Sequence, residues 1–298
     1  MKSVGVIGLG DMGSGLARNC LKAGFEVWGR DLDAQRQAQL VSEGVKGAAS
    51  AAEVGRKAQA VFVMVMAGAH AQAAIFGADG LASAMAPGTT IILSATIKPS
   101  EAEAIAAGLE GTGIDLIDTP VSGGFPGAQG GTLTMMAAAP KAVLAREMEV
   151  LRAVGKDIHH VGERPGMGQT VKACLQALLG SMFAATFEAA VLAAKSGVDP
   201  VVFHKVVSTS SGGAPLVANA LEKIMAGAFT GTGSAIATMY KDLTISNDHG
   251  REQGVPLFMA AAALQLFQAG ITKYPAEDNW TVTKVLEEIV GAEFRKAP

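Results

Sequence analysis

The stretch Ser3-Val4-Gly5-Val6-Ile7-Gly8-Leu9-Gly10-Asp11-Met12-Gly13 decides the fold that we expect of this chain. Its first part, Ser3–Leu9, is a short run rich in valine and isoleucine, which is typical of a buried parallel strand. The Gly-x-Gly-x-x-Gly motif Gly8–Gly13 follows at once. In such a motif the first glycine permits a tight turn, the second lets the backbone approach a pyrophosphate, and the third lets the next helix pack closely. That helix then presents its N-terminal amides to the phosphates.

The residues after the motif complete a dinucleotide-binding unit. Helical spacing covers Ser14–Ala23, Gly24 is a stop signal, and Phe25–Trp28 indicates a second strand. Asp31 lies just past that strand, where a carboxylate accepts hydrogen bonds from the adenosine ribose hydroxyls and repels a 2′-phosphate, so it favours NAD. Arg30 is either a solvated charge or a partner for that phosphate, so NADP stays open as the alternative. The cofactor contacts expected from this unit are Gly8, Leu9, Gly10, Asp11, Met12, Gly13, Arg30 and Asp31.

Strand and helix patterns continue to alternate up to about residue 161. Further strands are expected at Ala60–Met66, Thr89–Leu93, Ile114–Asp118, Thr132–Ala137 and Ile158–Val161. Helices are expected at Asp33–Gly44, His70–Met85 with a break at Gly77–Gly80, Ser100–Gly108 and Lys141–Val154. Repeated strand-helix-strand units predict a doubly wound, mainly parallel sheet with helices on both faces, which is the α/β Rossmann architecture.

Ligands of such sheets bind beyond the carboxyl ends of the strands. Three segments are expected there, namely Met66–Gly68, Ser94–Thr96 and Asp118–Gly124. Met66 is expected to contact the cofactor. Ser122, Gly123 and Gly124 offer a hydroxyl and unobstructed backbone amides directly after a strand, which suits a substrate carboxylate. The alternative is an ordinary glycine-rich loop, which would extend to residue 131 before the next strand.

Composition narrows the class of protein. The 298 residues are 49% hydrophobic and 17% charged, which allows a large core and two domains. The net charge of −3 gives no basic surface, so nucleic acid is not an expected partner. Two distant cysteines, Cys20 and Cys174, fit a reducing compartment and no metal site. Because no signal-peptide cleavage site and no uninterrupted run of roughly 18 apolar residues are present, we expect a cytoplasmic protein without a membrane partner.

From Gly166 onward the patterns are helical. A long helix is expected over Lys172–Lys195, with Gly197 as its stop signal. Further helices are expected at Val201–Ser208, Pro215–Met225, Ser234–Gln253, Pro256–Ala269 and Asn279–Phe294. We therefore expect a cofactor-binding domain of residues 1–164 and an all-helical domain of residues 165–298, which holds the substrate and builds the oligomer.

Lys172 is a lone lysine near the start of the long apolar helix. A surface lysine that snorkels beside the core is the alternative to a catalytic role. The sequence lacks the zinc ligands of alcohol dehydrogenases, the tyrosine-lysine pair of short-chain dehydrogenases, a Gly-x-Ser-x-Gly elbow and a Walker loop. A nicotinamide reaction without a metal needs a protein group to take the hydroxyl proton, and Lys172 is the best-placed candidate. Because an ordinary lysine has a pKa of about 10.4, Lys172 must be desolvated or lie near another cation to act as a base at neutral pH.

Four motifs in order along the chain resemble those of the β-hydroxyacid dehydrogenases, which include 3-hydroxyisobutyrate dehydrogenase and tartronate semialdehyde reductase. They are Gly8–Gly13, Asp118-Thr119-Pro120-Val121-Ser122-Gly123-Gly124, Gly166–Lys172 and Lys241-Asp242-Leu243. The resemblance implies that Lys172 is the general acid/base and that Ser122, Gly123 and Gly124 hold the substrate carboxylate. It further implies that Thr96 and Lys241 lie against the nicotinamide or close the cleft over it. A long helix would join the two domains, and the helical domain would build a homodimer or homotetramer.

One position departs from the family pattern. The family usually carries asparagine four residues after the lysine, and this chain has Gln176, which reaches about one methylene further from the same helix face. Gln176 is expected to bind the substrate and orient the reacting oxygen. The segment Gln176–Gly180 resembles the branch that acts on four-carbon sugar acids such as L-threonate. The alternatives are 3-hydroxyisobutyrate or 2-hydroxy-3-oxopropionate as substrate, an imine reductase, and a non-catalytic NAD(P)-binding sensor.

Overall fold

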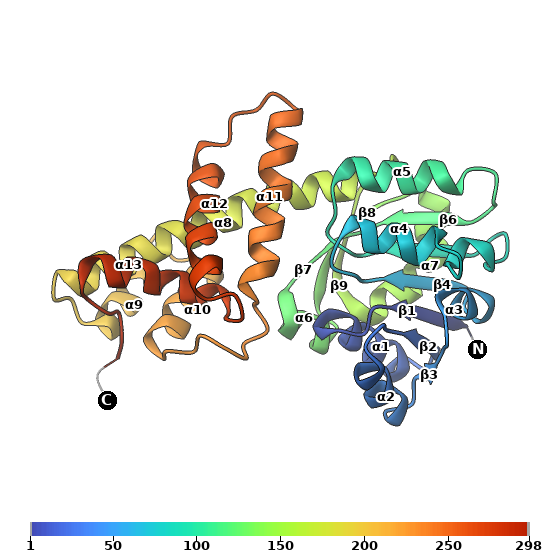
Figure 1. Ribbon diagram of the computed structural model, residues 1–298, viewed down its shortest axis with the longest axis horizontal. Coiled ribbons are helices and arrows are strands. Elements are labelled where there is room, and N and C mark those ends of the chain that lie inside the picture. The colour runs from blue at the N-terminus through green and yellow to red at the C-terminus, as the bar shows by residue number, and fades with distance from the viewer. Residues whose placement is uncertain (1, 297–298) are drawn as a thin grey trace. The chain divides into compact units, whose positions relative to one another are not determined.

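The computed structural model describes residues 2–296, which form two compact units (Figure 1). The first unit ends at Lys172 and the second begins at Ala173. The described strands all belong to the first unit, whereas the second consists of helices. The expected domain boundary between residues 164 and 165 stays a prediction.

The first unit is built on one sheet whose central part is parallel. The strand order is β3-β2-β1-β4-β5-β6, after which β8 pairs antiparallel with both β6 and β7, and β9 pairs parallel with β8. The strands are β1 (Ser3–Ile7), β2 (Glu26–Arg30), β3 (Lys46–Gly47), β4 (Ala60–Val63), β5 (Thr90–Leu93), β6 (Asp115–Asp118), β7 (Val121–Ser122), β8 (Leu133–Ala138) and β9 (Gly155–Gly162). Because β1 lies between β2 and β4, the strand order reverses at β1, and the glycine motif follows at this switch point.

Helices cover both faces of the sheet (Figure 1). Residues of β4 alternate between the two cores, with Ala60 and Phe62 in one and Val61 and Val63 in the other. The helices of this unit are α1 (Asp11–Lys22), α2 (Ala34–Ser42), α3 (Ala51–Lys57), α4 (Gly68–Phe76), α5 (Pro99–Leu109), α6 (Gly124–Gly130) and α7 (Lys141–Val154), with a 3-10 turn at Leu81–Ser83. The prediction of a mainly parallel, doubly wound sheet is confirmed.

The helix α6 replaces the glycine-rich loop that the sequence suggested for residues 124–131, so that interpretation is wrong. Tertiary contacts with α1 explain the helix. A Cβ on Gly15 of α1 would lie 2.5 Å from the carbonyl oxygen of Ala128, so α1 and α6 are in backbone contact. Asn19 strengthens this contact, since its Nδ2 donates to the Ala128 oxygen at 2.8 Å. Close packing of two helices thus overrides the low helix propensity of glycine.

The elements α3 (Ala51–Lys57) and β9 (Gly155–Gly162) also differ from the sequence prediction. The helix α3 was not expected, although Ser50 caps it by accepting from the backbone N–H of Glu53 at 3.2 Å, and this Ser-x-x-Glu pattern is visible in the sequence. The last strand, expected at Ile158–Val161, is the longer β9, because its pairing with β8 begins at Gly155 and continues to Gly162.

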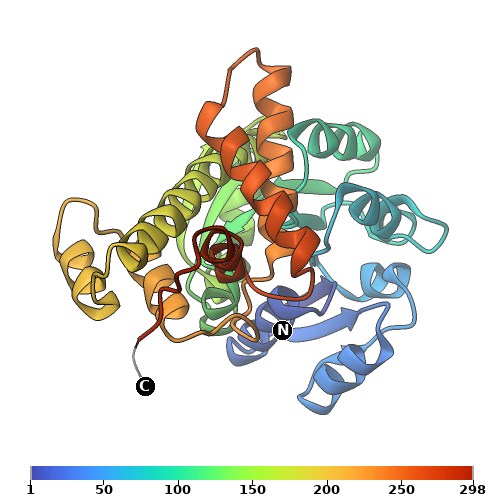
Figure 2. The same ribbon diagram turned by 60° about the vertical axis from the view of Figure 1, so that its left-hand side comes forward.

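The second unit contains helices around an aromatic core, and it is coloured yellow to red in Figure 2. Its first element is the later part of α8 (Met167–Lys195), which begins in the first unit. Phe183 of α8 stacks on Phe187 with ring centroids 5.9 Å apart and meets Trp280 edge-on at 5.6 Å. The other helices are α9 (Pro200–Thr209), α10 (Pro215–Met225), α11 (Ile236–Glu252), α12 (Phe258–Lys273) and α13 (Val282–Val290), with a 3-10 turn at Asn279–Thr281. The all-helical second part is confirmed.

The last expected helix, Asn279–Phe294, ends early. Gly291 has a φ of +63°, which terminates α13 in the left-handed conformation that favours glycine. Phe294 lies beyond it and is fully buried. The buried carboxylate of Glu287 holds this segment, since its Oε1 accepts from the backbone N–H of Phe294 at 2.9 Å.

Within residues 2–296, α8 is the one helix that is long and apolar enough to cross a membrane, with a mean hydropathy of 1.7 over its most apolar stretch. Polar residues such as Gln176, Ser181 and Glu188 interrupt its apolar sequence, so no uninterrupted apolar run marks it. Core helices of globular units have the same composition. Phe183 and Phe187 of α8 are 4% and 0% exposed. We therefore assign the later part of α8 to the core of the second unit.

Candidate active site

The glycine motif lies between β1 and α1, and its backbone leaves no room for side chains. Gly8 has a φ of +88°, and a Cβ there would lie 2.2 Å from the carbonyl oxygen of Met64. A Cβ on Gly13 would lie 1.8 Å from the carbonyl oxygen of Gly8. Only glycine fits both positions. The bare backbone before the N-terminus of α1 is what a bound pyrophosphate requires, so these residues fit a dinucleotide cofactor.

We expect Gly13→Ala to weaken NADH binding at least tenfold, or about 1.4 kcal/mol, because the added methyl group must push α1 away from the loop. Fluorescence titration of NADH measures this affinity. Gly212→Ala is the matched control, since a Cβ there would meet only Ser210 Oγ at 3.7 Å. A Gly13→Ala protein that binds NADH as tightly as the wild type would contradict the cofactor cradle.

Asp31 and Arg30 lie beside the glycine motif, as expected. Asp31 Oδ2 accepts from the backbone N–H of Leu9 at 2.5 Å, and Oδ1 accepts from that of Asp33 at 2.8 Å. The Arg30 guanidinium donates to Gln37 Oε1 at 3.1 Å and to the carbonyl oxygen of Asp31. Arg30 is half-buried, so it is held against α2 and is not a freely solvated charge.

Sequence reasoning missed Arg36, in the first turn of α2. A Cβ on Gly10 would lie 3.2 Å from Arg36 Nη1, so the guanidinium lies over the glycine motif. Arg36 also pairs with Asp33 at 3.6 Å. A cation at this place suits a phosphate-bearing ligand. Its position just after Asp31 is the signal in the sequence that could have found it.

The segment after β6 brings the expected carboxylate-binding residues to the carboxyl edge of the sheet. Ser122 ends β7 and is half-buried. Gly123 and Gly124, with φ of +127° and +57°, turn the chain into α6. Gln129 of α6 then donates from Nε2 to the carbonyl oxygen of Asp11 at 2.8 Å. This second candidate segment is thus attached to the helix that follows the glycine motif.

Met66 and Thr96 follow the neighbouring strands β4 and β5 at the same edge. Met66 is 54% exposed, and Thr96 is half-buried. Because β1, β4 and β5 are parallel and adjacent, their carboxyl ends lie side by side.

Lys172 is buried, so the alternative of a snorkelling surface lysine is wrong. The residue is 6% exposed, and its Nζ donates to the carbonyl oxygen of Val121 at 2.8 Å. Val121 directly precedes Ser122. The first unit therefore places a buried amine beside the segment expected to hold a carboxylate, which is the arrangement needed for proton transfer to or from a bound hydroxy acid.

Gln176 and Lys241 both contact Asp242, which was not among the site residues expected from the sequence. Gln176 Nε2 donates to Asp242 Oδ2 at 2.7 Å, and Lys241 Nζ lies 2.9 Å from Asp242 Oδ1. Gln176 and Asp242 are 5% and 3% exposed. Because a carboxylate only accepts hydrogen bonds, it fixes the amide with its nitrogen towards Asp242. Gln176 Oε1 is buried without a hydrogen-bond partner among residues 2–296, so it remains as an acceptor.

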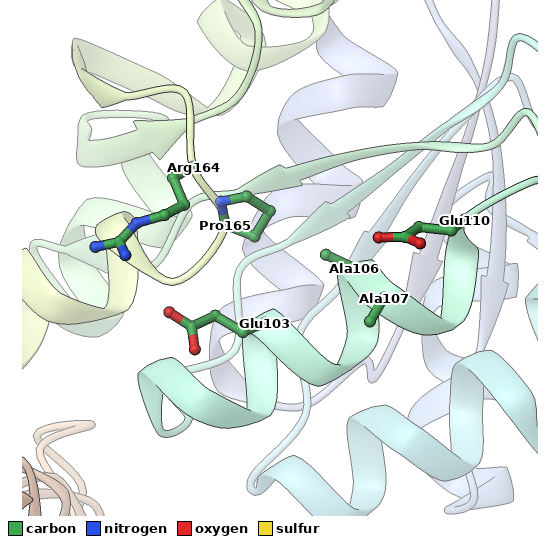
Figure 3. Close-up of a pocket in the computed structure, with 6 residues that line it drawn as sticks. All are labelled: Glu103, Ala106, Ala107, Glu110, Arg164 and Pro165. Atoms are coloured by element: carbon green, nitrogen blue, oxygen red, sulfur yellow. The ribbon is translucent and has the colours of Figure 1, made fainter.

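A shallow pocket of about 330 Å³ lies elsewhere on the first unit (Figure 3). Its lining residues are Glu103, Ala106, Ala107 and Glu110 of α5 with Arg164 and Pro165. None of the expected site residues lines it. This pocket therefore does not mark the candidate active site.

Two family models match most of the chain. Residues 3–162 match the NAD binding domain of 6-phosphogluconate dehydrogenase, and residues 166–286 match the NAD-binding domain of NADP-dependent 3-hydroxyisobutyrate dehydrogenase. L-threonate dehydrogenase of Escherichia coli O6:H1 is 35% identical over 96% of this chain and 95% of that protein. 2-(Hydroxymethyl)glutarate dehydrogenase of Eubacterium barkeri is 37% identical over 97% and 96%. The crystal structure of 3-hydroxyisobutyrate dehydrogenase from Salmonella typhimurium has a TM-score of 0.88 at 36% identity, covering 96% of this chain and all of that one.

A glycine cradle at the switch point of a Rossmann sheet fits a dinucleotide, and the matched family models of NAD-binding domains place the chain among the nicotinamide-dependent oxidoreductases. The chain belongs to the β-hydroxyacid dehydrogenase family. It is an NAD(P)-dependent enzyme that acts on CH–OH groups. The resemblance drawn from the four sequence motifs is confirmed.

Proposed function

We propose that this enzyme oxidises a small hydroxycarboxylic acid with NAD, and that a four-carbon sugar acid such as L-threonate is its preferred substrate. The main support for the proposed reaction is the burial of Lys172, whose Nζ lies 2.8 Å from the Val121 oxygen beside Ser122. Support for the substrate comes from similar proteins of several bacteria that are named L-threonate dehydrogenase. The unpartnered acceptor of Gln176 adds to it, since a polyhydroxylated acid offers hydroxyl donors.

Lys172 is the general acid/base in this proposal. Bound NAD supplies the hydride acceptor. In its neutral form the Lys172 amine takes the proton of the substrate hydroxyl, and the resulting ammonium keeps its hydrogen bond to the Val121 oxygen. Ser122, Gly123 and Gly124 hold the substrate carboxylate, and Gln176 orients the reacting oxygen. Asp242 acts on the substrate through Gln176, because it fixes the direction of that amide.

Cofactor binding in this proposal rests on the glycine motif and on Asp31. The contacts are Gly8, Leu9, Gly10, Asp11, Met12, Gly13, Arg30, Asp31, Met66, Thr96 and Lys241. The oxygens of Asp31 that accept from Leu9 and Asp33 each keep a lone pair for a ribose hydroxyl. A 2′-phosphate would be repelled by the same carboxylate, so NAD is preferred over NADP.

We also propose a homodimer or homotetramer formed through the second unit, and a division into domains of residues 1–164 and 165–298. Large apolar side chains of the second unit are exposed, with Leu192, Phe258 and Met259 at 69%, 75% and 68%. The proposed location is the cytoplasm, with neither nucleic acid nor membrane as a partner, in line with the net charge of −3.

A substrate panel tests this function. NADH or NADPH formation is followed with L-threonate, D-glycerate, 3-hydroxyisobutyrate and L-serine, each with NAD and with NADP. We expect the highest kcat/KM with L-threonate and NAD, at least roughly tenfold above the same acid with NADP, because of the charge repulsion at Asp31. A preference for 3-hydroxyisobutyrate would replace the proposed substrate. No turnover of any acid, together with tight NADH binding, would favour the non-catalytic sensor.

A further inference from the structure

Asp118 and Gln169 form a buried pair where β6 ends and α8 begins. They are 0% and 1% exposed, and Gln169 Nε2 donates to Asp118 Oδ1 at 2.9 Å. We propose that this pair is a positioning device, which fixes Lys172 and Thr96 relative to Ser122 for the hydride-transfer step. The inference rests on the proposed function, in which Lys172 exchanges the proton. Neither residue of the pair is proposed to touch the substrate.

Asp118 holds the first turn of α8. Its Oδ2 accepts from the backbone N–H groups of Gly168 at 3.0 Å and of Gln169 at 3.3 Å. The first amides of a helix have no partner within the helix, and an anion at that end is favoured by the helix dipole. The carboxylate at the end of β6 therefore decides where α8 starts and in which direction its first turn faces.

Gly168 brings the helix directly against the sheet. A Cβ on Gly168 would lie 2.5 Å from the carbonyl oxygen of Asp118 and 2.6 Å from that of Met136. The start of α8 thus rests on the backbone ends of β6 and β8, which are paired at this place. Such backbone contact transmits small displacements, because no flexible side chain lies between the elements.

Gln169 connects the same turn to the segment after β5. Its Nε2 also donates to the carbonyl oxygen of Ala95, and its Oε1 accepts from the backbone N–H of Ile97, both at 3.0 Å. These two contacts flank Thr96 on either side. With the bond to Asp118, the described contacts use both donors and the acceptor of the amide, so Gln169 joins β5, β6 and α8 at one point.

Two connections between residues 118–121 and α8 fix the position of Lys172. The segment 118–121 is tied to α8 at both of its ends, by Asp118 to the first turn and by the Val121 oxygen to Lys172 Nζ. Ser122 comes next in the chain. Loss of the first connection removes the support that Asp118 gives to the start of α8, so the position of Lys172 relative to Ser122 becomes less sharply defined. A displacement of about 1 Å in a catalytic group can lower the rate on the order of a hundredfold.

The variants Asp118→Asn and Gln169→Leu test the pair. Their kcat and KM are measured with the best substrate of the panel, and their affinity for NADH is measured without substrate. Asp118→Asn is expected to lower kcat about 10- to 100-fold, with KM and NADH affinity within about threefold of the wild type. Gln169→Leu is expected to lower kcat similarly and to weaken NADH binding as well, because Thr96 loses both flanking contacts. The measurement of NADH affinity does not depend on turnover. If Asp118→Asn does not fold, Gln169→Met, which keeps the side-chain length, carries the same kinetic test.

Thr90→Val is the matched control. Thr90 is fully buried at the opposite end of β5, and its Oγ1 donates to Glu147 Oε1 at 2.9 Å. This variant also loses a buried hydrogen bond of the first unit, so it should lower Tm but leave kcat unchanged. A loss of kcat in Thr90→Val as large as that in Asp118→Asn would mean that the effect is general destabilisation, and would overturn the proposal.

A double-mutant cycle separates this inference from the proposed function. If Asp118 acts through Lys172, adding Asp118→Asn to Lys172→Ala should change the residual rate by less than about twofold. Additive losses would contradict a role through Lys172. Wild-type kcat in folded Asp118→Asn and Gln169→Leu, with unchanged NADH affinity, would reject the pair even where Lys172→Ala abolishes turnover. Full turnover in Lys172→Ala would instead reject the proposed function.

Discussion

Lys172→Ala is expected to lower kcat about a thousandfold and to leave NADH affinity within about threefold of the wild type. The substitution removes the buried amine that we propose as the acceptor of the hydroxyl proton, and that amine lies 2.8 Å from the Val121 oxygen. NADH binding persists because the cofactor cradle is formed by the glycine motif Gly8–Gly13 after β1. Stopped-flow or steady-state NADH formation measures the rate, and fluorescence titration measures the affinity.

Two further variants make the result specific. Lys172→Arg keeps a cation of similar length but is not deprotonated near neutral pH, so it should be almost as inactive as the alanine variant. Lys195 is the matched control, because it lies on the same helix and its Nζ donates to the carbonyl oxygen of Val290 at 2.7 Å. Lys195→Ala should retain full turnover, since that lysine is exposed. More than a tenth of wild-type kcat in Lys172→Ala would reject the acid/base role.

The glycine motif was predictable because its signal is local. Strand, motif, helix and Asp31 follow one another within one strand-helix-strand unit, so spacing alone predicts their arrangement. The structure adds only the contacts that enforce it, such as the 1.8 Å approach of a Cβ on Gly13 to the Gly8 oxygen. The position of Arg36 was not predicted, because its approach to Gly10 depends on how α2 packs, and residue spacing does not show that packing.

The burial of Lys172 and the contacts of Asp118 were not predictable, because their partners are distant in sequence. Lys172 meets a carbonyl 51 residues earlier, and Asp118 meets amides 50 and 51 residues later. Helical spacing placed Lys172 and Gln176 on one face but did not say whether that face is buried. The helix α6 was misread for the same reason, since its packing on α1 joins segments about a hundred residues apart.

Asp118→Asn should change the pH dependence of stability as well as the rate. Burial raises the pKa of Asp118 from 3.8 to about 6, against the opposing effect of the hydrogen bonds from Gln169 and the backbone amides of Gly166 and Gly168. The folded protein therefore binds this proton more tightly than the unfolded chain. The stability that this group contributes is complete below about pH 4 and is lost as the pH rises through about 6. The difference in pKa corresponds to roughly 3 kcal/mol.

Asparagine stays neutral at every pH, so the variant does not show the decrease in the free energy of unfolding that ionisation of Asp118 causes in the wild type. The free energy of unfolding of Asp118→Asn, minus that of the wild type, should become more positive by roughly 3 kcal/mol between about pH 4 and pH 7. Urea unfolding measures it in a Trp280→Phe background, where Trp28 alone reports on the first unit. The other titratable groups are common to both proteins, so their contributions to the pH dependence cancel in the difference.

A difference in the free energy of unfolding that does not change with pH would show that Asp118 does not titrate in this range. A rising difference would mean that the ionised carboxylate destabilises the fold at neutral pH while it holds the first turn of α8, so stability is exchanged for the placement of Lys172.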